Sequence, residues 1–225
     1  MAESKMSLVL DRLAPIYKEG VFPGRSDQSG PPSWPDDPFH VLIATVLSQR
    51  TRDENTRRAA DKLFQALPDI VSMAQADPLA MEDLIRPAGF PRQKAVAIQR
   101  ICQEILDSFH GEVPSDIDSL LRLPMVGRKT ANCVLAYGFG MDAICVDTHV
   151  HRISNLLGEV STRSPDETEM ALRAKVPQSR WRDINRYLVR HGQVLCLPGR
   201  ERCQECPVQD LCDHGMQAKV SSGSK

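Results

Sequence analysis

The chain has 225 residues, a formal net charge of -1, 41% hydrophobic residues and 25% charged residues. It is long enough to bury one or two cores, and its balanced charge means that any surface for nucleic acid must be a local basic patch. It contains no apolar run of membrane-spanning length, and residues 1–7 lack the apolar core of a signal peptide. These features argue against a membrane protein and predict a cytoplasmic one.

The first half of the chain predicts helices separated by loops. Apolar residues at helical spacing indicate a short amphipathic helix over 8–17, and the Pro, Gly, Ser and Asp content of 22–38 indicates a loop. The apolar run 39–48 predicts a buried helix, although its β-branched residues leave a strand open. Further helices are predicted over 53–67, 77–86 and 95–109, the last after a tight break at 89–91.

The second half continues the helical pattern. Ser115 and Asp118 resemble a capping pair for a short helix that runs into Pro124. The tail after His214 is polar and is predicted to be frayed. Further helices are predicted over 128–137, 147–157, from 164 onwards and over 179–195. No strand is predicted, so the expected fold class is all-α.

The segment LLRLPMVGRKTA at 120–131 interrupts one helix and starts another. It predicts two helices joined by a tight hairpin, and the N-terminus of the second helix attracts anions such as phosphate. Lys129 at this helix start has a plain interpretation as a phosphate contact. Crowding by Arg128 and by the helix dipole also favours the neutral amine that a nucleophile needs. The spacing leaves both interpretations open.

A carboxylate follows this hairpin in the segment Val-Asp-Thr-His at 146–149. Asp147 is well placed to cap a helix, which is the plain interpretation. A carboxylate at the edge of a cleft can also stabilise a cationic sugar. A lysine and a carboxylate near a phosphate-binding hairpin together suggest chemistry on a nucleic acid.

Four of the seven cysteines fall close together near the C-terminus, whereas Cys102, Cys133 and Cys145 lie in apolar segments and are predicted to be small buried side chains. Four clustered thiolates suit either tetrahedral zinc or an iron–sulfur cluster. A single close Cys-x2-Cys pair favours a cluster, and zinc remains the alternative. The predicted ligands are Cys196, Cys203, Cys206 and Cys212.

Basic residues gather in two places along the sequence. They form either solvated helix faces or surfaces that meet DNA phosphates. The first group comprises Arg180, Arg182, Arg186, Arg190, Arg200 and Arg202. The second comprises Arg86, Arg92, Lys94 and Arg100.

The hairpin, the Val-Asp-Thr-His segment and the cysteine spacing together resemble the helix-hairpin-helix DNA glycosylase superfamily, and within it the endonuclease III family, over about 37–212. The resemblance implies two helical domains flanking a DNA-binding groove. One is a helical barrel over 31–141 that contains the hairpin at about 116–138. The other is discontinuous, over 1–30 and 142–225, and carries one four-iron, four-sulfur (4Fe-4S) cluster on the four clustered cysteines.

The resemblance also implies an activity, that of a DNA glycosylase with lyase activity at abasic sites. Lys129 matches the nucleophile, which forms a Schiff base with a flipped nucleotide and nicks the strand by β-elimination, and Asp147 matches the catalytic carboxylate. The implied partner is duplex DNA with oxidised pyrimidines or abasic sites, bound by a monomer at the nucleoid of a prokaryotic cell. The implied DNA-binding residues are Pro124, Met125, Val126, Gly127, Arg128, Thr130, His149, Arg200 and Arg202.

Three positions depart from the family pattern. Met125 stands where the family usually has glycine, which affects the hairpin backbone. Arg50 stands where the family has a glutamine that enters the gap left by the flipped base, and Gln49 beside it is an alternative. Phe90 replaces the leucine of the second wedge and can stack on exposed bases.

Two other functions remain open on the sequence. A DNA-binding protein without catalytic activity is compatible with the changes at Met125 and Arg50. An iron–sulfur redox protein is compatible with the cysteines, which serve a structural cluster equally well. The adenine-mismatch branch of the superfamily lacks a lysine at position 129, so lyase activity on oxidised pyrimidines is favoured.

Overall fold

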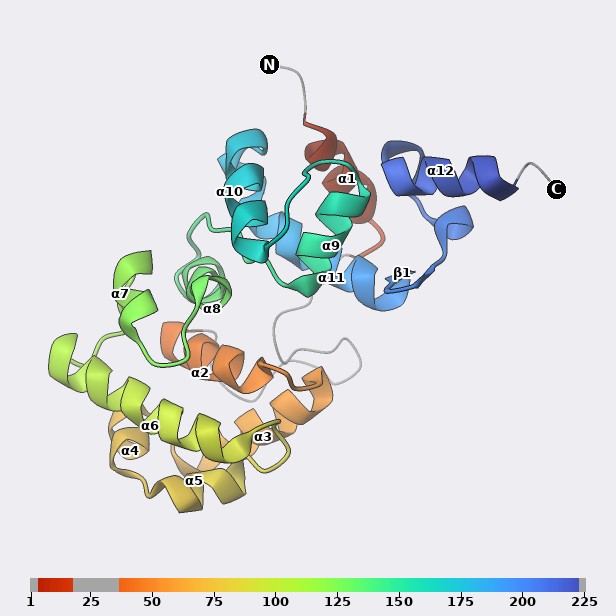
Figure 1. Ribbon diagram of the computed structural model, residues 1–225. Coiled ribbons are helices and arrows are strands. Elements are labelled where there is room, and N and C mark those ends of the chain that lie inside the picture. The colour runs from red at the N-terminus through yellow and green to blue at the C-terminus, as the bar shows by residue number, and fades with distance from the viewer. Residues whose placement is uncertain (1–3, 18–36, 223–225) are drawn as a thin grey trace. The chain divides into compact units, whose positions relative to one another are not determined.

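The computed structural model describes residues 4–17 and 37–222, most of which are helical (Figure 1). The chain divides into two compact units, one formed by Met1–Val21 with Asp142–Lys225 and the other by Phe22–Met141. The first junction between the units and most of the predicted loop at 22–38 lie outside the described residues. Within these described ranges, no helix is both long and apolar enough to cross a membrane.

The unit Phe22–Met141 is organised around one buried helix, α2. Its sequence is apolar on every side, and it contacts α3, α6, α8 and the π-helix η1. The segment is a helix rather than a strand: Asp37 caps its start by accepting from His40 N, and Pro38 is its first residue. Helix α6 runs along α4 and α5 (Figure 1). The elements are α2 Pro38–Ser48, α3 Asp53–Ala66, α4 Ile70–Gln75, α5 Pro78–Leu84, α6 Pro91–Ser108, α7 Ile117–Arg122, α8 Arg128–Cys133 and η1 Val134–Gly138.

The other unit packs its N-terminal helix against C-terminal ones. Helix α1 contacts α11, which also packs on α9, and α9 contacts α10. Their apolar faces meet in one core that includes Leu10, Ile153 and Leu188. The elements are α1 Lys5–Leu13, α9 Thr148–Leu156, α10 Pro165–Lys175, η2 Gln178–Arg180, α11 Trp181–Val194, β1 Cys196–Leu197, β2 Arg200–Glu201, η3 Cys203–Glu205, η4 Gln209–Leu211 and α12 Asp213–Ser222.

The prediction of a frayed tail after His214 is wrong for residues 215–222, which belong to α12, and residues 223–225 lie outside the described part of the chain. The first residue of α12 is tied to the rest of the unit. Lys5 Nζ donates to Asp213 Oδ1 at 2.9 Å and to the Leu157 carbonyl at 2.7 Å. Gly158, with a φ of 71°, leaves room for the Asp213 carboxylate where a Cβ would collide with it. The tail is thus anchored by contacts that its own polar sequence does not reveal.

Three smaller expectations also need correction. The cap of α7 is Asp116, whose side chain accepts from Ser119 N, so the pairing of Ser115 with Asp118 is wrong. Helix α4 was not predicted, although Asp69 opens it with a capping box. Strands β1 and β2 form a two-residue antiparallel pair where only loop was expected.

Candidate functional site

The hairpin between α7 and α8 has a buried base and an exposed tip. Leu123 and Val126 are 2% and 6% exposed, and Val126 N donates to the Leu123 carbonyl at 3.2 Å. Met125, which lies between these two buried residues, is exposed. Gly127, which directly precedes α8, is exposed as well. Because the N-cap of α8 is Gly127, no N-cap side chain accepts from the first N–H groups of the helix. Lys129 is the second residue of α8 and is partly buried.

Met125 lies at the hairpin tip with a φ of 58°, in the left-handed region that favours glycine. A residue with a Cβ pays about 1–2 kcal/mol to hold its backbone in this left-handed conformation. The Met125→Gly variant should therefore be more stable by about 1 kcal/mol, since the greater backbone freedom of glycine in the unfolded chain offsets part of the gain. Urea denaturation measures this difference. Met125→Ala is the matched control, since it removes the side chain but keeps the backbone penalty. Equal stability of the two variants would contradict the prediction.

Gln49 connects the end of α2 to the hairpin. Its Nε2 donates to the Met125 carbonyl at 2.9 Å and to Thr130 Oγ1 at 3.3 Å. The amide is thus used within the protein. Arg50 and Phe90 are instead exposed, and the Arg50 guanidinium lies 5.8 Å from the centroid of the Phe90 ring. Of the three predicted wedge residues, Arg50 and Phe90 are therefore the two that remain available to a duplex.

Asp147 caps α9, as the sequence predicts. Its Oδ1 accepts from Val150 N at 2.8 Å. The buried Val146 before it and Val150 after it fix the backbone, and the Asp147 side chain is partly exposed. His149 is partly buried against Gly192 of α11, where a side chain would collide with its ring. The cap is confirmed, while the catalytic role of the carboxylate stays a prediction.

The four clustered cysteines line one cavity formed by α9, α11, the β1–β2 pair, η3, η4 and the start of α12. Burial raises the pKa of Cys206 to about 11 and also raises the pKa values of the other three thiols. The four side chains are half-buried, so their thiolates need positive charge nearby to be stable. In the described part of the chain, no three His, Cys, Asp or Glu side chains meet as ligands of a single metal ion. The shared cavity and the four sulfur donors fit a polynuclear cluster.

Two side chains that belong to no motif in the sequence lie beside these sulfurs. Arg152 of α9 donates to the carbonyl and, at 3.5 Å, to the Sγ of Cys196, and it pairs with Glu201 at 3.4 Å. His191 Nε2 lies 3.6 Å from Cys206 Sγ, and its Nδ1 lies 3.2 Å from the Tyr17 hydroxyl. Burial, followed by the charge of Arg152, lowers the pKa of His191 to about 4. The imidazole is therefore neutral at pH 7.

The predicted basic surfaces are only partly present. In the first group Arg180 pairs with Asp11 at 2.7 Å, and Arg202 donates to the Val194 carbonyl at 2.8 Å. Arg200 is exposed on β2. In the second group Lys94 is 1% exposed, so its assignment to a surface strip is wrong. The helical turn places Lys94 on the buried face of α6, in line with the apolar stripe.

Comparisons with known proteins agree on one family. The model of the HhH-GPD superfamily of base excision DNA repair proteins matches residues 43–178. Endonuclease III of Thermotoga maritima is 49% identical over 177 residues, which cover 79% of this chain and 83% of the relative. A solved non-covalent endonuclease III–DNA complex has a TM-score of 0.84 at 32% identity and covers 97% of this chain and 100% of its own. A trapped covalent endonuclease III–DNA intermediate gives the same values.

The chain therefore belongs to the HhH-GPD superfamily of base excision DNA repair proteins. Within that superfamily it groups with endonuclease III, and it is a DNA glycosylase and lyase of base excision repair. The all-α fold class is confirmed, and the alternative of a DNA-binding protein without catalytic activity is not favoured.

Proposed function

We propose that the enzyme acts on duplex DNA that contains oxidised pyrimidines or abasic sites, with Lys129 as its nucleophile. The observation that carries this proposal is the position of Lys129, at a helix start that has a glycine N-cap and directly follows the exposed hairpin tip. Such a hairpin can hold a DNA phosphate through its backbone. The same contact brings the neighbouring sugar toward the amine.

The reaction begins when the neutral amine of Lys129 attacks C1′ of a nucleotide flipped out of the stack. The bond from C1′ to the base breaks, and the base leaves with the electron pair and takes up a proton. Opening of the sugar gives an imine between C1′ and Nζ. Loss of a proton from C2′ then expels the 3′ phosphate, which nicks the strand. Hydrolysis of the imine returns the free lysine.

Asp147 assists the first of these steps. One of its oxygens is engaged by Val150 N, which fixes the orientation of the carboxylate. A fixed negative charge stabilises the positive charge that develops on the sugar as the base departs. Once the base is gone this charge is no longer needed, so we assign Asp147 mainly to base removal.

Borohydride trapping tests this function. The imine is reduced to a stable covalent adduct, so incubation of the protein with lesion-containing duplex and borohydride should give a cross-linked species. A panel with thymine glycol, dihydrothymine, an oxidised cytosine, an oxidised purine and a bare abasic site ranks the substrates. Adducts confined to the oxidised purine would overturn the assignment to pyrimidines, and no adduct with any duplex would overturn the lyase mechanism.

We also propose that Cys196, Cys203, Cys206 and Cys212 hold one 4Fe-4S cluster. Such a cluster would offset the negative charge of the half-buried thiolates and would link β1, which follows α11, to η3 and η4. The expected result is a brown protein with about four irons and four acid-labile sulfides per chain. Elemental analysis and visible absorption check this, and a colourless protein with stoichiometric zinc would contradict it.

The remaining proposals concern the setting of the enzyme. We propose that it works as a monomer, because one chain supplies both Lys129 and Asp147. Size-exclusion chromatography with light scattering, with and without abasic duplex, checks this oligomeric state. Because its substrate is genomic DNA, we also place the enzyme at the nucleoid of a prokaryotic cytoplasm.

A further inference from the structure

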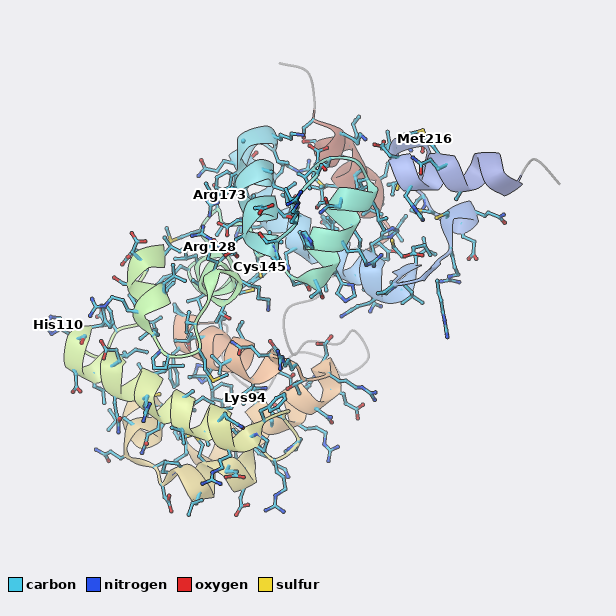
Figure 2. The ribbon with its side chains drawn as sticks, in the orientation of Figure 1. Lys94, His110, Arg128, Cys145, Arg173 and Met216 are labelled. Carbon is cyan, nitrogen blue, oxygen red and sulfur yellow. The ribbon has the colours of Figure 1, made fainter. Side chains whose placement is uncertain are left out.

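Lys94 is a buried cation on α6, labelled in Figure 2. Its Nζ donates to the carbonyls of Leu47 and Gln49 at 2.7 and 2.6 Å. It also donates to Thr51 Oγ1 at 2.9 Å. Burial lowers the pKa of Lys94 to about 8, so at neutral pH the amine is mostly protonated and has three N–H groups for these three oxygens.

The position of the charge explains how a buried cation is tolerated. The carbonyls of Leu47 and Gln49 lie at the C-terminal end of α2, where the helix dipole is negative and cations are favoured. A buried charge that is fully hydrogen-bonded avoids most of its desolvation cost. Lys94 thereby closes the turn between α2 and α3, the turn that carries Arg50.

A second loop is fixed to this turn. Gly89 N donates to Thr51 Oγ1 at 3.0 Å, and the backbones approach so closely that a Cβ on Gly89 would lie 2.6 Å from the Arg50 carbonyl oxygen. The residue after Gly89 is Phe90, which is 52% exposed. Arg50 and Phe90 both have left-handed backbones, with φ values of 50° and 56°. Two strained loops are thus joined, and each presents one exposed side chain.

The same turn also reaches the catalytic hairpin. Gln49 accepts from Lys94 through its backbone carbonyl, while its side-chain amide donates to Met125 and Thr130. A continuous set of hydrogen bonds therefore leads from Lys94 to the hairpin that carries Lys129. The wedge pair and the hairpin are held in one frame within this unit.

We propose that Lys94 is a positioning residue that presents Arg50 and Phe90 as a preformed pair and holds them in register with the hairpin. The inference rests on the proposed action at a flipped nucleotide, because the pair fills the space that the nucleotide leaves in the duplex. A preformed pair does not have to be ordered when DNA binds, so extrusion of the nucleotide is easier. Lys94 itself touches no DNA and acts through the two loops.

The test compares duplex with single-stranded DNA, since only a duplex needs a wedge. Lys94→Met keeps the aliphatic stem and removes the three hydrogen bonds. We expect its rate of incision at an abasic site in duplex to fall by about 10–100-fold. Incision of a single-stranded abasic oligonucleotide should stay within about twofold of the unsubstituted enzyme, because the chemistry at Lys129 is unchanged.

A fluorescent base gives a second readout. With 2-aminopurine opposite the abasic site, insertion of the wedge unstacks the base and raises its fluorescence. This increase should be lost in Lys94→Met and in a double Arg50→Ala, Phe90→Ala variant. Lys62→Met, which removes an exposed lysine on α3, controls for the loss of one positive charge and should behave as the unsubstituted enzyme does.

Variants of Thr51 keep the proposal testable if Lys94→Met does not fold. Thr51→Val removes the hydroxyl that joins Lys94 to Gly89 and should lower duplex incision selectively, whereas Thr51→Ser should restore it. Equal losses on duplex and single-stranded DNA, or no loss on either, would overturn the positioning role. Failure of the unsubstituted enzyme to form a borohydride adduct would instead overturn the proposed function, so the two failures are distinguishable.

Discussion

Lys129→Ala should lose both strand incision at abasic sites and the borohydride-trapped adduct, with incision falling by at least about 10³-fold. The physical reason is that Lys129 is the only lysine within α8, so the variant lacks the proposed nucleophile of the covalent step. The variant should still bind abasic duplex, because the hairpin backbone from Pro124 to Gly127 is retained. Single-turnover incision, trapping and fluorescence anisotropy measure the three properties.

Arg128→Ala is the matched control for this variant. It removes a cation from the adjacent position of the same helix start, and Arg128 is labelled on α8 in Figure 2. It should weaken DNA binding and reduce its salt dependence while the adduct still forms at saturating protein. An adduct in Lys129→Ala at the unsubstituted rate would assign the nucleophile to another amine. Loss of trapping in Arg128→Ala at saturation would show that the reaction requires the charge of Arg128 as well as an amine.

Local sequence signals predicted the long helices and the hairpin, because each rests on a pattern within a few residues. The apolar stripe of α6, the break at Pro124 and Gly127, and the cap at Asp147 are all of this kind. The six-residue α4 is too short to show a period, and α12 depends on contacts of Asp213 with Lys5 and Leu157. Such contacts join distant parts of the chain and leave no local signature.

Within the candidate site, the environment of Lys94 could likewise be predicted only in part. Its neighbours Arg92 and Arg100 suggested a basic surface, yet Lys94 lies one position before Ala95 and four before Ile98, on the apolar face. The helical period alone could have placed it inside. Its three partners could not have been predicted, because they lie more than forty positions earlier in the chain. The hydrogen bonds of Gln49 to the hairpin are equally non-local.

Asp147→Asn should separate the two roles that the sequence leaves open for this residue. Asparagine caps a helix as well as aspartate does, so its side-chain oxygen can still accept from Val150 N and the free energy of unfolding should change by less than about 0.5 kcal/mol. The variant has no negative charge to stabilise the sugar. Base removal should therefore slow by about 10²–10³-fold, while incision at a preformed abasic site should fall much less.

Asp147→Ala supplies the contrast, because it removes the charge and the cap together and should cost about 1 kcal/mol of stability in addition. Urea denaturation gives the stability of both variants, and single-turnover assays on lesion and abasic duplexes give the two rates. If Asp147→Asn removed bases at the unsubstituted rate, Asp147 would be a cap alone. If base removal and incision fell equally, the carboxylate would act on a step common to both, such as attack of the Lys129 amine on C1′. The expected pattern, intact stability with selective loss of base removal, assigns the charge to the departure of the base.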